Sequence, residues 1–97
     1  MKAILITYNQ AYYDEIAAVL NANGVTGFTE WDEIKGHGST TGEPHFGSHA
    51  WPTLNNAIIS IVDDEKVSGI LNQLHEKDLK APGLGLRAFV WNVEGMI

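Results

Sequence analysis

Hydrophobic residues are concentrated in four short stretches that have the pattern of strands. The segments 2–7 (KAILIT) and 57–62 (AIISIV) are short, nearly continuous apolar runs, which is typical of buried strands. In 87–93 (RAFVWNV), bulky apolar residues occupy every second position, which predicts a strand with one buried face. The segment 25–34 (VTGFTEWDEI) predicts a fourth strand, and a three-residue step between its aromatic side chains breaks the alternation. We therefore expect a bulge near Glu30.

Two further segments have the period of helices. Apolar residues recur at steps of three and four in 12–20 and again in 67–74, which places them on one face of each predicted helix. Asn9 is expected to cap the first helix, and Gly24 is expected to end it in the left-handed conformation. Asp63 is the expected cap of the second helix, and the acidic residues after it suit the helix dipole.

The predicted elements follow the order β-α-β-β-α-β. This is the order of a ferredoxin-like α+β sandwich, in which two helices cover one face of a four-stranded antiparallel sheet. A single domain accounts for residues 1–97. Two helices cannot cover both faces of the sheet. Trp31, Phe89 and Trp91 are therefore expected on an open face that a homo-oligomer buries.

Charge and composition argue against several classes of function. Six lysines and arginines against twelve aspartates and glutamates give a net charge of −6, which argues against nonspecific nucleic-acid binding. The absence of cysteine excludes a thiol nucleophile and a thiolate metal site, and it agrees with a reducing compartment. We find neither a signal peptide nor a run of about 18 apolar residues that could span a membrane. We therefore predict a cytoplasmic protein that does not insert into membranes.

The stretch 36–56 (GHGSTTGEPHFGSHAWPTLNN) has no hydrophobic rhythm, although it connects two strands that are expected to pair. Hairpin connections usually have about two to five residues, and loops above about 12–15 residues are usually functional or disordered. We expect a functional loop; the alternative is a tolerated insertion, because loop length costs little entropy. Phe46 and Trp51 are either anchors for a partner or a lid folded back on the domain.

The polar residues of this loop permit more than one kind of chemistry. GHGSTTG lacks the lysine of a P-loop, but the glycines beside His37 allow backbone amides to face an anion. Glu43, His45 and His49 could supply ligands to Zn²⁺, Cu²⁺ or Ni²⁺; alternatively, the histidines are exposed polar residues. No serine has an identifiable acid–base partner, so we predict that the protein is not an enzyme.

Together, these segments resemble the nitrogen regulatory protein P-II family. IKGHG at 34–38 is similar to the family's V-K-G-F-G, and GVTGFT at 24–29 is similar to its G-x-T-G-M-T. One extra residue between Thr29 and Ile34 fits the expected bulge. The resemblance in order and spacing extends over nearly the whole chain.

The resemblance implies a compact homotrimer whose open sheet faces turn inward. It also implies that an adenine nucleotide binds between subunits, and that the 36–56 loop, the family's T-loop, docks on a transporter or an enzyme. The implied ligand-binding residues are Thr29, Lys35, Gly36, His37, Gly38, Gly83, Gly85 and Arg87, with Arg87 as the main phosphate contact. The implied partner-binding residues are Glu43, Phe46 and Trp51.

Departures from the family pattern narrow the choice of ligand. Thr40 stands where the family's loop has a glutamine, which argues against binding of Mg-ATP together with 2-oxoglutarate. All three tyrosines, at positions 8, 12 and 13, precede the loop, which excludes uridylylation there. The family's arginine pair beyond the fourth strand is missing, so AMP, ADP or a cyclic nucleotide is expected in preference to ATP.

Two other functions stay open at this point. A related group of trimers with the same fold serves divalent-cation tolerance, and a metal site at Glu43, His45 and His49 would place the chain nearer to that group. Such a site should weaken as the pH falls through about 6.5. A purely structural trimer with a vestigial loop would bind no ligand. A nucleotide sensor instead needs the glycines of IKGHG and Arg87.

Overall fold

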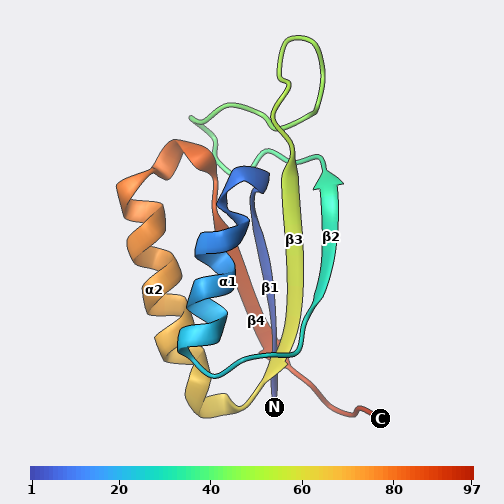
Figure 1. Cartoon of the computed structure of the whole chain (residues 1–97), viewed down its shortest axis with the longest axis vertical. Coiled ribbons are helices and arrows are strands. Elements are labelled where there is room, and N and C mark those ends of the chain that lie inside the picture. The colour runs from blue at the N-terminus through green and yellow to red at the C-terminus, as the bar shows by residue number, and fades with distance from the viewer.

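The computed structural model describes all residues, 1–97, and shows a sheet with two helices on one face (Figure 1). The strands are β1 (Lys2–Asn9), β2 (Thr29–Ile34), β3 (Asn55–Val62) and β4 (Arg87–Asn92), and the helices are α1 (Tyr13–Ala22) and α2 (Val67–Lys80). The strand order is β2-β3-β1-β4, and every neighbouring pair is antiparallel. The predicted ferredoxin-like α+β fold is therefore confirmed.

The hydrophobic core lies between the sheet and the two helices. Ile4, Ile6 and Tyr8 are fully buried and alternate along β1, so their side chains point to the helix layer. The same cluster contains Ile16, Val19 and Leu20 of α1, Ile58 and Val62 of β3, and Ile70 and Leu74 of α2. The helical period and the strand alternation of the sequence thus meet in one core.

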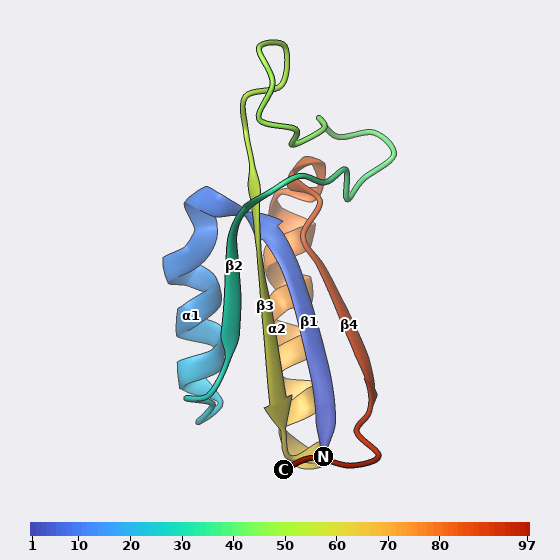
Figure 2. The ribbon, with the colours of Figure 1, turned by 90° about the vertical axis from the view of Figure 1, so that its right-hand side faces the viewer.

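The other face of the sheet carries large apolar side chains that no helix covers, and Figure 2 looks onto this face. Trp31, Phe89 and Trp91 are 49%, 55% and 45% exposed. Phe89 and Trp91 of β4 pair with Leu5 and Ala3 of β1, so the apolar surface is continuous across these strands. The expected open face is present.

Strand β2 differs from its prediction at its start and in its irregularity. It begins at Thr29, because Val25 is buried in the core and its N–H bonds to the end of α1. The expected bulge is present, but the register shift lies between Trp31 and Ile34, beyond Glu30.

The end of α1 agrees with the prediction, because Gly24 follows it with φ of 71°. The expected N-terminal caps differ. The side chain of Asn9 accepts a hydrogen bond from the N–H of Ala11 (2.9 Å), but this caps the 3-10 turn Gln10–Tyr12, and Tyr12 precedes α1 without a side-chain cap. Asp63 makes no capping hydrogen bond, so that prediction is wrong. The next residue, Asp64, pairs with the N-terminal ammonium group at 2.9 Å. Neither helix is long and apolar enough to cross a membrane.

Candidate ligand-binding site

The long connection between β2 and β3 consists of two arcs that meet at one pair of residues. Gly36 and His45 exchange two backbone hydrogen bonds, of 2.9 and 2.7 Å, and so close the inner arc (37–44). The outer arc (46–54) follows and projects beyond the end of the sheet (Figure 1). Its own hydrogen bonds include Gly47 N–H to the carbonyl of Thr53 at 3.1 Å.

The inner arc packs against the turn before β4 (82–86) through pairs of glycines. A Cβ atom on Gly38 would overlap the backbone of Gly85, and a Cβ atom on Gly42 would overlap the carbonyl of Gly83. Gly85 also has φ of 70°, a conformation that L side chains rarely adopt. Glycine is therefore required at Gly38, Gly42 and Gly85 for the two backbones to touch.

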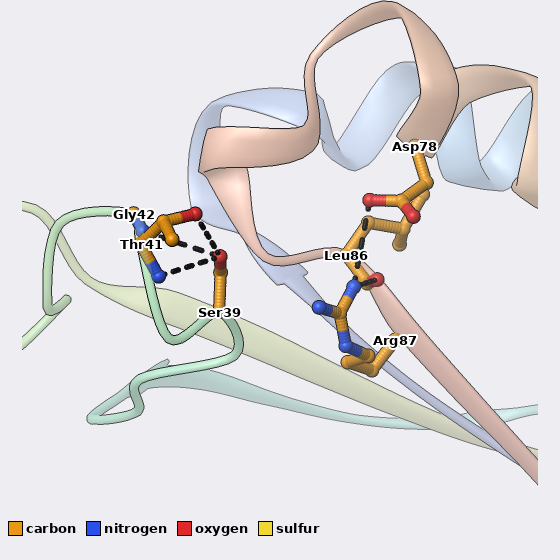
Figure 3. Close-up of polar contacts among 6 residues, drawn as sticks. All are labelled: Ser39, Thr41, Gly42, Asp78, Leu86 and Arg87. Atoms are coloured by element: carbon orange, nitrogen blue, oxygen red, sulfur yellow. Dashed lines mark hydrogen bonds and ion pairs between the residues drawn. The ribbon is translucent and has the colours of Figure 1, made fainter.

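Side chains within the inner arc satisfy its own backbone. The hydroxyl of Ser39 accepts hydrogen bonds from the N–H groups of Thr41 (3.3 Å) and Gly42 (3.2 Å), as Figure 3 shows. The His37 ring lies 3.0 Å, through Nε2, from the carbonyl of Gly42, and it meets Phe46 edge-on. An anion could use the two N–H groups only if Ser39 turned away.

His45 is a buried support of the loop base. Its side chain is only 5% exposed, and its Nδ1 lies 2.5 Å from Oδ1 of Asn55. Asn55 also limits Gly36, whose Cβ would lie 2.7 Å from the Asn55 amide nitrogen. The ring thus joins the base of the loop to the start of β3.

The structure does not form the metal site that was one alternative. No three histidine, aspartate or glutamate side chains lie close enough together to hold an ion, so Glu43, His45 and His49 are not a ligand set. The physical reason is that His45 turns inward to Asn55 while His49 stays exposed on the outer arc.

The two cationic side chains of the predicted site, Lys35 and Arg87, differ in whether they are paired within the chain. Lys35 is exposed, and its ammonium group makes no ion pair. Arg87 is turned toward α2, where its Nη1 lies 3.4 Å from Oδ1 of Asp78 and 2.6 Å from the carbonyl oxygen of Leu86 (Figure 3). In this arrangement the Arg87 guanidinium is occupied by partners within its own chain.

Thr29 is the predicted site residue that does not join the others. It lies at the start of β2, whereas the loop base lies at the end of that strand. A strand rises about 3.3 Å per residue, which separates Thr29 from the loop base by roughly 16 Å. Thr29 can therefore complete this site only from another copy of the chain.

Three contributors to the geometry were not among the predicted site residues. Asn55 anchors His45, Ser39 holds the turn of the inner arc, and Asp78 holds Arg87. The polar pair Asn55-Asn56 at the start of an apolar strand was the one available signal, because buried amides need partners.

The comparison with protein families agrees with this geometry. The family described as "Nitrogen regulatory protein P-II" matches residues 1–97. The chain belongs to this family. The resemblance seen in the sequence is thus confirmed. Among curated proteins, none matches this chain.

Solved structures share the P-II fold at low sequence identity. CPII from Thiomonas intermedia K12, bound to ADP and bicarbonate, has a TM-score of 0.77 and 23% identity over 95% of this chain and 84% of its own. The apo form of the same protein has a TM-score of 0.68 and 20% identity, over 95% and 87% of the two chains. A putative PII-like signaling protein from Thermus thermophilus has a TM-score of 0.68 and 23% identity, over 95% and 85%.

Proposed function

We propose that this chain is a P-II-like signal-transduction protein that binds an adenine nucleotide, AMP or ADP, beside the inner arc. The observation that carries the proposal is the contact between Gly38 of the arc and Gly85 of the turn before β4. The N–H of Gly38 makes no hydrogen bond within the chain and is available to an anion, whereas the N–H of Gly85 donates to the carbonyl of Pro82 at 3.4 Å. Membership of the P-II family and the ADP and AMP in structures of CPII support the same ligand class.

The phosphate is bound by few cations in this proposal. Lys35 is free to reach it, and Arg87 joins only after leaving Asp78. Two cations balance the charge of a monophosphate or diphosphate better than that of a triphosphate. This balance favours AMP and ADP over ATP. Bicarbonate, which was bound in the CPII structures, is the second anion to test.

The site is completed by oligomerisation in this proposal. The exposed apolar face around Phe89 and Trp91 is suited to contact with two other copies, which gives a homotrimer. Thr29 of a neighbouring copy then faces the nucleotide. Replacing Trp91 with glutamate should yield monomers in sedimentation velocity, because the charge would be buried without a partner. An unchanged mass would contradict the proposed interface.

In this proposal, the outer arc binds a regulated protein in the cytoplasm. That protein is a transporter or an enzyme. The nucleotide must bind one arrangement of the loop better than another, because only differential affinity shifts a conformational equilibrium. The protein then acts as a switch and performs no chemical step itself.

The test is a calorimetric and thermal-shift titration with AMP, ADP, ATP, cyclic AMP and bicarbonate. A ligand at 100 times its Kd stabilises the native state by about 2.7 kcal/mol. We expect a rise in Tm with AMP or ADP that Gly38→Ala abolishes and that Gly95→Ala retains, because an added Cβ at Gly95 meets nothing. If no nucleotide raises the Tm of the intact chain, the proposed function is wrong.

A further inference from the structure

A cavity of about 280 Å³ opens between the two helices, at the end of the molecule that carries the long loop. The start of α1 and the end of α2 contribute to its lining, and Figure 1 shows both helix ends at this end of the sheet. None of the residues of the proposed nucleotide site lines it. The cavity is therefore a separate concave site, on the helix side of the domain.

Apolar side chains form the floor of this cavity. Tyr8 of β1 and Ile16 of α1 line it and are each only 1% exposed, so they lie at its deep end. Tyr12, Leu84 and Leu86 also line it and are half-buried, so they form its walls. An apolar cavity of about 150 Å³ is large enough to bind benzene. The present volume therefore admits one aromatic ring or an alkyl chain of medium length.

The mouth of the cavity carries positive charge that has no partner within the chain. Lys77 and Lys80 line it from the last turn of α2, where Lys77 is half-buried and Lys80 is exposed. Side chains three residues apart on a helix lie on the same face. Neither lysine belongs to the two ion pairs of the chain. Glu15 is the one carboxylate in the lining, so two positive charges against one negative charge suit a ligand with a single negative charge.

The turn before β4 contacts both this cavity and the inner arc. The side chains of Leu84 and Leu86 line the cavity. Gly85, which lies between them in the sequence, meets Gly38 of the inner arc through its backbone. A molecule that packs against the two leucines therefore restrains the same turn on which the inner arc rests.

We infer that this cavity binds a small amphipathic carboxylate, and that the bound ligand restrains the turn before β4. The apolar ring or alkyl chain lies on the floor, and the carboxylate lies at the mouth beside Lys77 and Lys80. Burial of apolar surface supplies the affinity, and the two ammonium groups select an anion. This binding does not depend on a nucleotide, so its test is separate from that of the proposed function.

The experiment is a nitrogen-15 NMR titration of the full chain with octanoate as the probe. We expect saturable shifts centred on the amides of Ile16, Lys80 and Leu84, with a Kd of about 1 mM, as for other ligands of this size. Octylammonium has the same alkyl chain and the opposite charge, and it should leave these signals unchanged. Equal shifts with octylammonium, or no saturable shifts with octanoate up to about 10 mM, would overturn the proposal.

Two variants test the mouth and the floor by different means. Lys77→Gln combined with Lys80→Gln removes both ammonium groups and should weaken octanoate binding by about three- to tenfold. Lys66→Gln makes the same kind of charge change just before α2, at the other end of that helix, and should keep the affinity. Ala81→Phe adds a ring at a lining position and should abolish binding by filling the cavity. Unchanged affinity in the double variant or in Ala81→Phe would overturn the proposal.

Amide hydrogen exchange tests the restraint of the turn. The N–H of Leu84 donates to the carbonyl of Ala81 at 3.1 Å. If opening of the turn destroys the site, octanoate at about four times its Kd should raise the protection factor of this N–H about fivefold. The N–H of Lys66, which donates to the carbonyl of Asp63 at 3.0 Å in a similar turn before α2, should keep its value. An unchanged value at Leu84 would overturn the restraint.

ADP separates this proposal from the proposed function. Octanoate should bind whether or not ADP binds, and saturation with ADP should not displace it. Displacement of octanoate by ADP would place the nucleotide in this cavity and would overturn the proposal of a separate site. The titrations of the intact chain decide the matter even if a variant does not fold.

Discussion

The two arcs of the long loop lie next to each other in the sequence and are held in place in different ways. The inner arc rests on the body of the domain, where Gly38 and Gly42 touch the backbone of the turn before β4. The outer arc is shaped by hydrogen bonds among its own residues, such as Ser48 N–H to the carbonyl of Trp51 at 2.9 Å. Figure 2 shows the same division, with the outer arc standing clear of the sheet.

The two arcs also differ in the groups that they present to their surroundings. The inner arc approaches the turn before β4 through backbone atoms, at Gly38 and Gly42. The outer arc instead exposes Phe46 and Trp51, by 39% and 38%, and aromatic side chains contribute much of the energy of protein interfaces. In the proposed function, the inner arc lies beside the ligand and the outer arc meets the partner, and the two arcs join at the pair Gly36–His45.

The largest effect is expected from Gly38→Ala, which separates the inner arc from the turn. The new Cβ would overlap backbone atoms of Gly85, which cannot move aside as a flexible side chain can. We expect a loss of stability of about 1–3 kcal/mol, as for other overpacked sites, and loss of nucleotide binding. Chemical denaturation and calorimetry measure the two effects.

Gly83→Ala is the matched control in the opposing turn. A Cβ there has open space, and the residue does not have a positive φ, so we expect a change in stability below about 0.5 kcal/mol. Equal losses in the two variants would show that the backbone contact does not hold the inner arc.

His45→Ala tests the junction between the arcs. The variant leaves the buried Oδ1 of Asn55 without its partner at 2.5 Å, which should cost about 1–3 kcal/mol. His49→Ala, at an exposed position, should change stability by less than about 0.5 kcal/mol. Thermal unfolding of the pair separates a structural histidine from a surface one. A larger loss in His49→Ala would contradict the assignment.

Asp78→Asn frees Arg87 at the start of β4 from its partner on α2. The ion pair is partly exposed and its atoms are 3.4 Å apart, so its loss should cost about 0–1 kcal/mol of stability. A released guanidinium should strengthen nucleotide binding severalfold if Arg87 is the phosphate contact. Calorimetry with ADP measures the change, and weaker binding would remove Arg87 from the proposed site.

The smallest effect on stability is expected at the outer arc. Phe46→Ala and Trp51→Ala remove side chains that are more than a third exposed, so we expect about 0.5 kcal/mol or less in each. Nucleotide affinity should stay within about twofold of the intact chain. A loss of stability above about 2 kcal/mol in Trp51→Ala would instead show that Trp51 covers the domain.

Much of the fold could be predicted because periodicity and burial are linked locally. The alternation along β1 and the helical spacing from Ile16 to Leu20 each specify which face is apolar, and one core satisfies both. The start of β2 could not be predicted in this way. Val25 is as apolar as a strand residue, and only the packing around it puts its side chain in the core and its N–H at the end of α1.

For the site, the sequence by itself determined the family, the glycines of the loop base and the turn, and the absence of thiol chemistry. Only the tertiary structure decided that Gly38 meets Gly85, that His45 turns inward to Asn55, and that Arg87 is held by Asp78. These are contacts between residues distant in the sequence or on an irregular loop. At such positions no local sequence period encodes the direction of a side chain. That direction is set by the partner that satisfies the polar atoms of the side chain.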